Sequence, residues 1–599
     1  MLIFDIETNS KNYSDVSIIW CACTYDTEKK ESGQYPPEKL QDFYSLLKKT
    51  LENGGKIAGH NIVLYDIPVL EKLMGPLPYK HGQIVDTLIL SRLMYPSEKG
   101  FSHSLAAWGE RIGVLKDTEY KEREGAWDVY SEDMLAYCSQ DVVVTEALIN
   151  RFASEDRPSP ASLYIEYRIG AVCAEMLKNG MAFDKDGAVS LQAKLDTDIS
   201  TAEKALEDMK IFIKVADIKK NLPKKADLEA VIPYNPGSSV HTRYLIEVMF
   251  DYHPKNSMLY KESTDKKTGE KVTKLSTDRA TKDFILRDPA APDRLKEIIK
   301  LISDINMMIK IRAAVLNWID ADRNGYIHCS IQPNVAVTGR ASHSNPNLAQ
   351  VPSSKIKAGE WQSEAYGHIC RALFKPHDGW IQVGIDLSGL ELRCLGHYLS
   401  KFDSGDYARE CSQGDVHTRN QKAIGLATRD AAKTWVYAYI YGAGDSTLGA
   451  KVGGSDKDGA RLRSNFMKAI PALKDFQEEL QSVVRSKGGF KAIDGRNIIV
   501  REPYKARNFL IQSCGAIICK LWLIRTLDIL KNDFGVSREK ALLQMWVHDE
   551  QQWRVKDIKT AETVIEAAKK AVKLVQKELK IKAELDCEGK SGNSWSDCH

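Results

Sequence analysis

Three short apolar segments of the chain carry carboxylates within a predicted strand or at its end. They are Leu2–Asn9, with Asp5 and Glu7, Trp380–Asp386 and Met545–Glu550. Apolar runs of this length predict buried strands, and several segments between them have helical periodicity. A chain of 599 residues is too long for one hydrophobic core, so about three to five domains are expected. The sequence therefore predicts a multidomain α/β protein with acidic groups at strand ends.

Asp5 and Glu7 form the first candidate site. Side chains alternate along a strand, so both carboxylates point to the same face of the sheet. Two such charges repel each other unless something neutralises them, and a divalent metal ion is the usual partner. Further predicted strands follow at Ile18–Tyr25 and Lys56–Ala58, and Asp66 comes soon after the second of them.

Two more residues belong to the same pattern. Glu132–Phe152 has helical periodicity, and Tyr137 and Asp141 lie four residues apart on it, so they share a helix face. Any one of these acids alone is more often a helix cap or a surface residue. Together they form the ordered pattern DxE, NxxxxD and YxxxD over about 140 residues.

Residues 428–444 predict a helix with an unusual face. The segment is rich in alanine, with an N-cap candidate at its start and two glycines at its end. Arg429, Lys433, Tyr437 and Tyr441 recur every four residues, and a drift of about 40° per step gives a stripe about 120° wide. Two cations and two aromatic rings on one face suit a triphosphate and a base. Spacing alone fits equally well a half-buried amphipathic helix whose cations reach solvent.

Charge is divided unevenly along the chain. The whole chain has 84 Lys+Arg and 81 Asp+Glu, a net charge of +3. Residues 1–150 hold 15 basic and 23 acidic residues, a net charge of −8, and the other 449 hold 69 and 58, a net charge of +11. Chance variation between solvated surfaces is the alternative explanation. An acidic head (residues 1–150) that binds metal ions, followed by a basic body (residues 151–599) that binds nucleic acid, would give this division.

The acid pattern of the head resembles the three motifs of the DEDD-type 3′→5′ exonucleases, in the subgroup that carries a tyrosine. The resemblance implies that two Mg²⁺ or Mn²⁺ ions are bound by Asp5, Glu7, Asp66 and Asp141. Two such ions generate a hydroxide and stabilise the leaving oxygen of an in-line displacement. Tyr137 would orient the attacking water.

The rest of the chain resembles family A, the DNA polymerase I-like DNA polymerases. Five segments carry this resemblance: motif A at Asp386–Arg393, motif B at Arg429–Gly442, motif C at His548–Glu550, and the template-contact segment at Thr338–Arg340 with Pro346–Leu348. Within the family the likeness is strongest to the replicative polymerases of T-seven-type phages, on DLSGLELR, TRDAAKT, GDVHT and a Trp…Cys-His ending. It covers essentially the whole chain.

The resemblance implies which residues would bind the metal ions and the nucleotide. Asp386 and Asp549 would bind both catalytic ions, and the carbonyl of Leu387 would complete the site on the nucleotide side. The triphosphate would be held by His417, Arg429 and Lys433. Lys433 would also protonate the pyrophosphate leaving group.

Other residues would read the base pair and the sugar. Tyr437 would stack on the incoming nucleotide, and Glu391 would lie beneath C2′ and exclude ribonucleotides together with Tyr437. Tyr441 would pack beside the template base. The minor groove and the primer end would be contacted by Arg340, Asn508, Gln512 and His548. A purely structural role for His548 is equally open.

The motifs predict an RNase H-like exonuclease followed by a right-hand polymerase. The expected divisions are 1–155 exonuclease, 156–330 thumb and palm entry, 331–411 palm with the template-contact segment and motif A, 412–502 fingers, and 503–599 palm with motif C. Gly187–Met209 and Arg294–Asp320 predict long thumb helices. Lysine-bearing loops at Lys214–Lys225 and Lys255–Lys282 would contact duplex phosphates.

The expected function is template-directed DNA synthesis from dNTPs on a primer, with proofreading, in phage replication. Possible partners are a helicase-primase and a single-strand-binding protein. T-seven-type thumbs carry a large thioredoxin-binding insertion, whereas here Asn235–Ser239 follows the first thumb helix after about 25 residues. Thioredoxin is therefore not expected. We expect a monomer in the cytoplasm, or in the host cytoplasm if the chain is phage-encoded.

Composition argues against other classes. An uncharged apolar run of about 18 residues is missing, so no membrane span is expected, and the start lacks the basic region of a signal or transit peptide. Twelve scattered cysteines without a CxxC pair predict reduced thiols. Three alternatives remain: a nuclease with an inactive polymerase body, a single-subunit RNA polymerase, and a non-enzymatic clamp. The intact acid sets argue against the first and third, and Glu391 with the attached exonuclease against the second.

Overall fold

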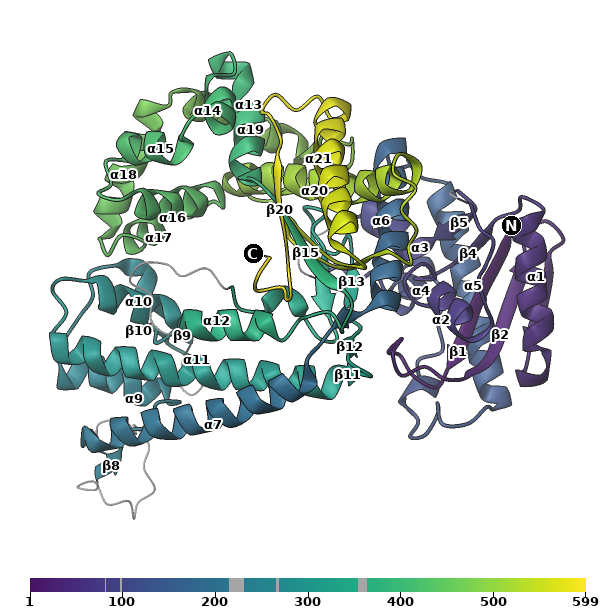
Figure 1. Ribbon diagram of the computed structural model, residues 1–599, viewed down its shortest axis with the longest axis horizontal. Helices are drawn as coiled ribbons and strands as arrows, with labels where there is room; N and C mark the ends of the chain where they lie inside the picture. The colour runs from purple at the N-terminus through teal and green to yellow at the C-terminus, as the bar shows by residue number, and fades with distance from the viewer. Residues whose placement is uncertain (81, 97–99, 215–230, 265–268, 354–362, 599) are drawn as a thin grey trace.

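The computed structural model describes the chain except residues 81, 97–99, 215–230, 265–268, 354–362 and 599. Figure 1 shows a head, coloured purple to blue, beside a larger body whose central sheet has helices on both sides. Arg323 Nε donates to Asp15 Oδ1 at 2.8 Å, and Arg92 Nη1 donates to Gln332 Oε1 at 2.7 Å. These contacts join the head to the body.

The head is built on a five-stranded sheet in the order β3-β2-β1-β4-β5. β1 pairs antiparallel with β2 and parallel with β4, and β4 pairs parallel with β5. The three strands and the helix predicted for this region are confirmed to within two residues. The elements are β1 (Leu2–Thr8), β2 (Ile19–Asp26), β3 (Glu31–Tyr35), α1 (Leu40–Glu52), β4 (Ile57–Gly59), α2 (Asp66–Leu73), β5 (Ile84–Asp86), α3 (Thr87–Met94), α4 (Leu105–Ile112) and α5 (Glu132–Ala153).

Helix α5 covers the strand that carries the first acids. It begins at a polar cap, because Ser131 Oγ accepts a hydrogen bond from Met134 N at 3.1 Å. Its buried residues include Tyr137, Cys138 and Asp141, and the helix packs against β1 and β2. The packing of one helix on one strand therefore brings the distant acid motifs together.

A long helical arm follows the head. The predicted helices Gly187–Met209 and Arg294–Asp320 correspond to α7 and α11, which pack on each other. The elements are α6 (Pro160–Asn179), β6 (Met181–Ala182), α7 (Lys185–Asp208), β7 (Phe212–Lys214), β8 (Val231–Pro233), α9 (Ser239–Tyr244), β9 (Tyr260–Thr264), β10 (Lys271–Leu275), α10 (Arg279–Arg287), α11 (Asp293–Ala321), β11 (Asp322–Arg323) and β12 (Tyr326–Ile327).

The prediction of a loop at Lys255–Lys282 is wrong. Its described residues form the antiparallel pair β9 and β10, with Tyr260 opposite Leu275, and the start of α10. Most side chains of both strands are exposed, so the apolar alternation that marks a strand is missing from the sequence. Residues 265–268, within the predicted loop, lie outside the described residues, as do all residues of the predicted loop Lys214–Lys225 except Lys214.

The body is centred on a four-stranded sheet in the order β18-β19-β15-β20. The strand predicted at Trp380–Asp386 is β15, and the strand predicted at Met545–Glu550 is β18, although Glu550 begins the next strand, β19, instead of ending β18. The elements are β13 (Ser330–Gln332), β14 (Ser342–Ser344), α12 (Ser363–Ala372), β15 (Ile381–Leu387), α13 (Leu390–Asp403), α20 (Ala506–Asn532), β18 (Ala541–Val547), β19 (Glu550–Val555), α21 (Ile558–Glu578) and β20 (Cys587–Gly592).

A group of helices, green in Figure 1, lies on the side of the sheet opposite α7 and α11. Within it α16 begins at the predicted cap, where Thr428 Oγ1 accepts from Ala431 N at 3.2 Å. The elements are α14 (Asp406–Gln413), α15 (Val416–Ile424), α16 (Arg429–Ile440), α17 (Asp445–Ala450), α18 (Asp456–Ala469), α19 (Ala472–Lys487), β16 (Gly489–Lys491) and β17 (Asn497–Ile499). The expected fingers and thumb thus lie on two sides of the expected palm.

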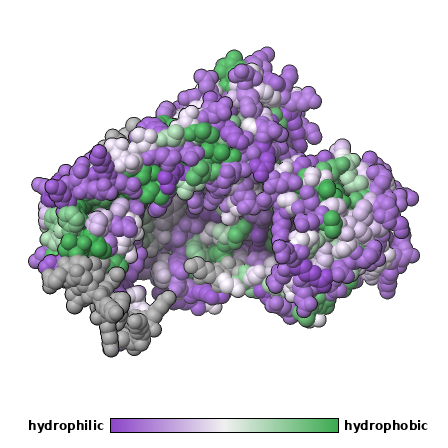
Figure 2. Space-filling view, turned by 90° about the horizontal axis from the view of Figure 1, so that it is seen from below, coloured by the Kyte–Doolittle hydropathy of each residue, from purple (hydrophilic) through white to green (hydrophobic). Residues whose placement is uncertain are grey.

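One helix in the described part of the chain, Pro503–Asn532, is long and apolar enough to cross a membrane by length and composition. Its most apolar window is 83% buried inside the protein, as in the core helix of a folded domain. Trp522 Nε1 donates to the Ala568 carbonyl of α21 at 2.9 Å. Figure 2 shows a largely hydrophilic face with scattered hydrophobic patches. All twelve cysteines lie in described positions and none forms a disulfide.

Candidate active sites

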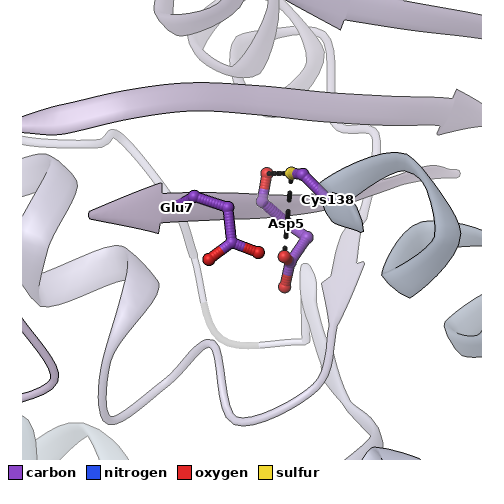
Figure 3. Close-up of side chains that lie close together, drawn as sticks. All are labelled: Asp5, Glu7 and Cys138. Carbon is purple, nitrogen blue, oxygen red and sulfur yellow. Dashed lines mark hydrogen bonds between the residues drawn. The ribbon is translucent and has the colours of Figure 1, made fainter. Parts of the chain in front are cut away.

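The first acid centre lies on β1 in the head. Asp5 and Glu7 project from the strand to the same side, and Cys138 of α5 lies beside them (Figure 3). One potential ligand atom from each of the three lies within 4.8 Å of the others. Cys138 Sγ donates to the Asp5 carbonyl at 3.4 Å and lies 3.7 Å from Asp5 Oδ2. The predicted shared face is confirmed, and the cysteine is an addition that no motif indicated.

Asp66 and Asp141 are buried near Asp5 and Glu7, and their charges act on the same centre. Asp66, at the start of α2, and Asp141, on α5, are 4% and 3% exposed. Burial and then Asp141 raise the pKa of Asp5 to about 7, and burial and then Asp5 raise the pKa of Asp66 well above its usual range. Burial and then Asp5 also raise the pKa of Glu7. The four carboxylates therefore interact as one buried group.

A lysine that the sequence did not indicate lies within this acid group. Lys116 Nζ pairs with Asp141 Oδ2 and lies 4.6 Å from the centre of the Tyr137 ring. Burial lowers the pKa of Lys116, but the charges of Asp141 and Tyr137 outweigh it, and the net shift is upward. Lys116 stands alone in the loop after α4, without periodicity or a spaced partner, so no sequence signal could have identified it.

The donor set of the head fits a hard divalent cation. Carboxylate oxygens are the ligands that Mg²⁺ and Mn²⁺ prefer. Asp141 Oδ1 is buried and has no hydrogen-bond partner among the described residues. Tyr137 is buried against Tyr120 and Trp127, with ring centres at 5.3 and 5.7 Å, so its ring is held beside the acids. A buried oxygen of this kind is satisfied when a metal ion is bound.

The second acid centre lies where two strands of the body end. The Leu387 N–H donates to the Asp549 carbonyl at 3.0 Å, and Asp386 lies opposite Glu550 in the pairing of β15 with β19. Burial, then Asp386 and Glu391, raise the pKa of Asp549 to about 8. Two aspartates 163 positions apart in sequence are thus brought to one place, as predicted.

Glu550 is held by the protein itself. Its Oε1 accepts from Trp595 Nε1 at 2.7 Å and from Gln552 Nε2, and its Oε2 lies 3.9 Å from Arg371 Nη1. Arg371 is 6% exposed and lies 4.6 Å from the Trp595 ring. Glu550 therefore supports the strand end instead of offering both oxygens to a ligand.

The stripe predicted on α16 faces outward. Ala432, Trp435, Val436, Tyr439 and Ile440 are buried on the opposite face, so the amphipathic interpretation is correct for that side. On the stripe itself Arg429 and Lys433 are exposed, Tyr437 is partly buried and Tyr441 is 38% exposed. The two cations and two rings are therefore accessible together.

Arg429 and His417 lie at the start of this stripe. Arg429 Nη2 pairs with Asp415 Oδ1 at 3.2 Å, and both side chains are about half exposed. An exposed pair contributes little stability, so an anionic ligand can replace Asp415. The His417 ring lies 6.4 Å from the Tyr437 ring. Burial, then Lys433 and Arg429, lower the pKa of His417.

Glu391 is held by two side chains of the candidate site. Tyr441 Oη donates to Glu391 Oε1 at 2.6 Å, and Arg340 Nη2 lies 3.5 Å from the same oxygen. Arg340 also lies 5.8 Å from the centre of the Tyr441 ring. Tyr441 lies one helical turn beyond Tyr437, at the end of α16, and its hydrogen bond to Glu391 is a contact that the sequence did not indicate.

The remaining predicted residues lie near these groups. Asn508 and Gln512 are partly exposed on α20, one turn apart, and Asn508 Oδ1 is buried without a hydrogen-bond partner among the described residues. His548 is exposed at the turn between β18 and β19, with φ at 55°. Its carbonyl accepts from Trp546 Nε1 at 2.7 Å.

The chain thus carries two separate acid centres, one beside a tyrosine and one facing a basic and aromatic helix. The first suits cleavage of a phosphodiester and the second suits its formation. One chain that does both has the organisation of a nucleic-acid polymerase with its own exonuclease.

Comparison with known proteins identifies which polymerase this is. Residues 255–597 match the family model described as DNA polymerase family A, and residues 1–155 match one described as 3′-5′ exonuclease. The chain belongs to family A of the DNA polymerases and is a DNA-directed DNA polymerase with a 3′→5′ exonuclease domain.

Relatives and a solved structure agree with this assignment. The DNA-directed DNA polymerases of Enterobacteria phage T3 and Escherichia phage T7 are each 31% identical over 718 aligned positions, which cover 100% of both chains. The polymerase domain of Pol1 from M. smegmatis, solved with DNA primer-template and dNTP, has a TM-score of 0.71 and 17% identity. The match covers 100% of this chain and 95% of that one and shows a shared fold.

Proposed function

We propose that primer extension takes place at Asp386 and Asp549, with Mg²⁺ as the metal in both active sites and Mn²⁺ able to replace it. The observation that carries this is the hydrogen bond from Leu387 N to the Asp549 carbonyl, which holds the two strand ends side by side. Asp386, Asp549 and the Leu387 carbonyl would hold the ions. Bound there, the ions would lower the pKa of the primer 3′-hydroxyl and neutralise the triphosphate.

The chain's own residues position the nucleotide. Arg429 and Lys433 bind the phosphates, and Lys433 protonates the pyrophosphate as it leaves. His417 donates a hydrogen bond to phosphate from its ring. Tyr437 stacks on the base. Arg340, Asn508, Gln512 and His548 contact the primer end and the minor groove.

Sugar selection would depend on Glu391. Tyr441 fixes its carboxylate with a 2.6 Å hydrogen bond, so a 2′-hydroxyl would meet an occupied position. This supports dNTPs over ribonucleotides and disfavours an RNA polymerase. Tyr441 would pack beside the template base.

In the head, Asp5, Glu7, Asp66 and Asp141 would hold the ions that activate water against the terminal phosphodiester. Tyr137 orients that water, since its ring is fixed by neighbouring aromatic rings. A mispaired primer end, which frays more readily than a paired one, would be removed there.

Primer extension and degradation test this proposal in one experiment. Asp386→Ala should abolish dNTP addition and leave 3′→5′ degradation unchanged, whereas Asp5→Ala with Glu7→Ala should do the reverse. Omitting dNTPs isolates degradation, and supplying NTPs tests sugar selection. Full exonuclease activity in the double variant would refute the assignment of the head.

Several expectations about context belong to the same proposal. The alignments with the two phage polymerases span 718 positions, whereas this chain has 599 residues, so 119 aligned positions have no counterpart here. The absence of these positions from this chain supports a thumb without a thioredoxin-binding insertion. We further propose a monomer that replicates phage DNA in the host cytoplasm with a helicase-primase and a single-strand-binding protein. Tight thioredoxin binding that lengthens products would contradict this.

A further inference from the structure

Four charged side chains lie buried beside the template-contact segment and take no part in the mechanism above. Glu166 lies on α6, Lys520 on α20, and Asp494 and Arg496 lie between β16 and β17. Each is at most 5% exposed. We call these four residues the buried charge cluster.

The cluster is internally paired across three elements. Glu166 Oε1 accepts from Lys520 Nζ at 2.5 Å and from Arg496 Nη1 at 2.6 Å. Arg496 also donates from Nε and Nη2 to Asp494 Oδ2 at 2.8 and 2.6 Å. Two positive and two negative charges therefore cancel. Buried ion pairs are often no more stabilising than apolar residues of the same volume, so stability alone is a weak reason for this arrangement.

Gly339 lies directly against this cluster. Its φ is +75°, and a Cβ there would lie 2.7 Å from Arg496 Nη1 and 3.8 Å from Lys520 Nζ. The turn is closed by a hydrogen bond from Gly339 N to the Ala336 carbonyl at 2.7 Å. The next residue is Arg340, whose guanidinium reaches Glu391 and Tyr441 in the polymerase site.

We propose that the buried charge cluster positions Arg340 and thereby helps the polymerase to reject a mispaired primer end. The inference rests on the role proposed above for Arg340 in contacting the primer end. Groups with fixed partners on α6, α20 and the β16–β17 turn hold the backbone of Gly339 at a fixed place. Glu166, Arg496 and Lys520 are then positioning residues that touch neither DNA nor nucleotide.

The test is a double-mutant cycle with Arg340. Glu166→Gln with Lys520→Met removes one charge of each sign and leaves the Arg496–Asp494 pair intact. The matched control is Glu578→Gln with Arg525→Met, which removes an ion pair of 2.9 Å between α20 and α21. In an Asp5→Ala, Glu7→Ala background, kcat/KM is measured for extension of paired and mispaired primer ends.

The cluster variant should lower the ratio of paired to mispaired extension about tenfold, an effect expected from a displacement of less than about 1 Å. In an Arg340→Ala background the same change should alter the ratio less than about twofold, because coupled residues are not additive. The control pair should leave the ratio unchanged in both backgrounds.

Equal effects in both backgrounds, or an unchanged ratio in the folded cluster variant, would overturn the inference. If Arg340→Ala itself leaves the ratio unchanged, the proposed role of Arg340 fails and the inference fails with it. If Arg340→Ala lowers the ratio and the cluster variant does not, only the inference fails. Should the double change prevent folding, Lys520→Met alone leaves Glu166 paired with Arg496 and Arg496 paired with Asp494, and it is judged by the same criteria.

Discussion

At the scale of single residues, Lys116 compensates the buried charge of the nuclease acids when metal is absent. Lys116→Met leaves Asp141 without its ion-pair partner, and breaking a buried pair costs about 3 kcal/mol. We therefore expect a lower free energy of unfolding in EDTA at neutral pH, largely restored by Mg²⁺ or Mn²⁺. Thermal or denaturant unfolding with and without metal measures both values.

Lys121→Met is the matched control, because that lysine is exposed and lines one pocket together with Lys116 and Tyr137. It should change stability little in either condition. If Lys116→Met loses as much stability with metal as without it, Lys116 is not a counter-charge for the acids.

The second prediction concerns the hydrogen bond between Tyr441 and Glu391 and its effect on sugar selection. Tyr441→Phe removes the donor to Glu391 Oε1, and a hydrogen bond to a charged group contributes about 1.5–3 kcal/mol. Discrimination against rNTPs should fall by about tenfold or more, corresponding to at least about 1.4 kcal/mol. The readout is the ratio of kcat/KM for dNTP and rNTP.

Tyr439→Phe serves as the comparison for this variant. Tyr439 lies on the buried face of the same helix, and its hydroxyl has no hydrogen-bond partner among the described residues. An equal loss of discrimination in both variants would mean that the helix as a whole, not the hydrogen bond, sets sugar selection.

At the scale of elements, α17 and α18 pack closely enough to require glycine. A Cβ on Gly459 would lie 1.8 Å from the Asp445 carbonyl oxygen and 2.7 Å from Gly449 N. Gly459→Ala must separate the two helices, so we expect about 1–3 kcal/mol of destabilisation or more. Gly444→Ala, with no atom within 4 Å of its Cβ, should have little effect. Urea unfolding compares the two, and equal midpoints would contradict the close packing.

Elements with apolar periodicity could be predicted from the sequence, and polar ones could not. β1, β15 and β18 could be expected because their buried residues form short, mostly apolar runs. β9 and β10 are mostly exposed, and β20 reads Cys-Glu-Gly-Lys-Ser-Gly, so neither region shows a strand pattern. Their pairing is fixed by tertiary contacts, which local sequence does not record.

The same limit applies to the candidate sites. Asp5, Glu7, Asp386 and Asp549 could be placed because strand ends and ordered motifs indicate carboxylates. Lys116, Cys138, Arg371 and Trp595 could not, since each stands outside a pattern and reaches its site only through the fold. The hydrogen bond from Tyr441 to Glu391 could not be predicted either, because helical spacing alone does not show which aromatic side chain of the helix reaches the carboxylate.

At the scale of the whole molecule, both acid centres make stability depend on pH. The pKa values of Asp5, Asp141 and Asp549 are raised to about 7, 6 and 8, in each case first by burial. Between about pH 4 and 8 these three carboxyl groups therefore bind more protons in the folded chain than in the unfolded chain, so their contribution to stability falls as pH rises. In EDTA, we expect Tm to decrease from about pH 7 to 8.5, above the range in which buried histidines with lowered pKa values, such as His60 and His103, have the opposite effect.

Added Mg²⁺ should reverse this decrease, and its effect should grow with pH, because metal ions and protons compete for the same carboxylates. Calorimetry across the pH series measures both trends. Asp5→Asn with Asp549→Asn should flatten the slope in EDTA. A Tm that rises with pH in EDTA would show that the carboxylates are not destabilising in the metal-free protein.

The position of β20 has a consequence for how the protein is made. β20 (Cys587–Gly592) pairs with β15 beside Asp386, whereas in the described part of the chain no strand of the head pairs with a strand after β5. Domains of a growing chain generally fold in the order in which they leave the ribosome. The head is thus able to fold while the sheet of the second centre still lacks its outer strand. A translation product interrupted before residue 587 would therefore degrade primers without being able to extend them.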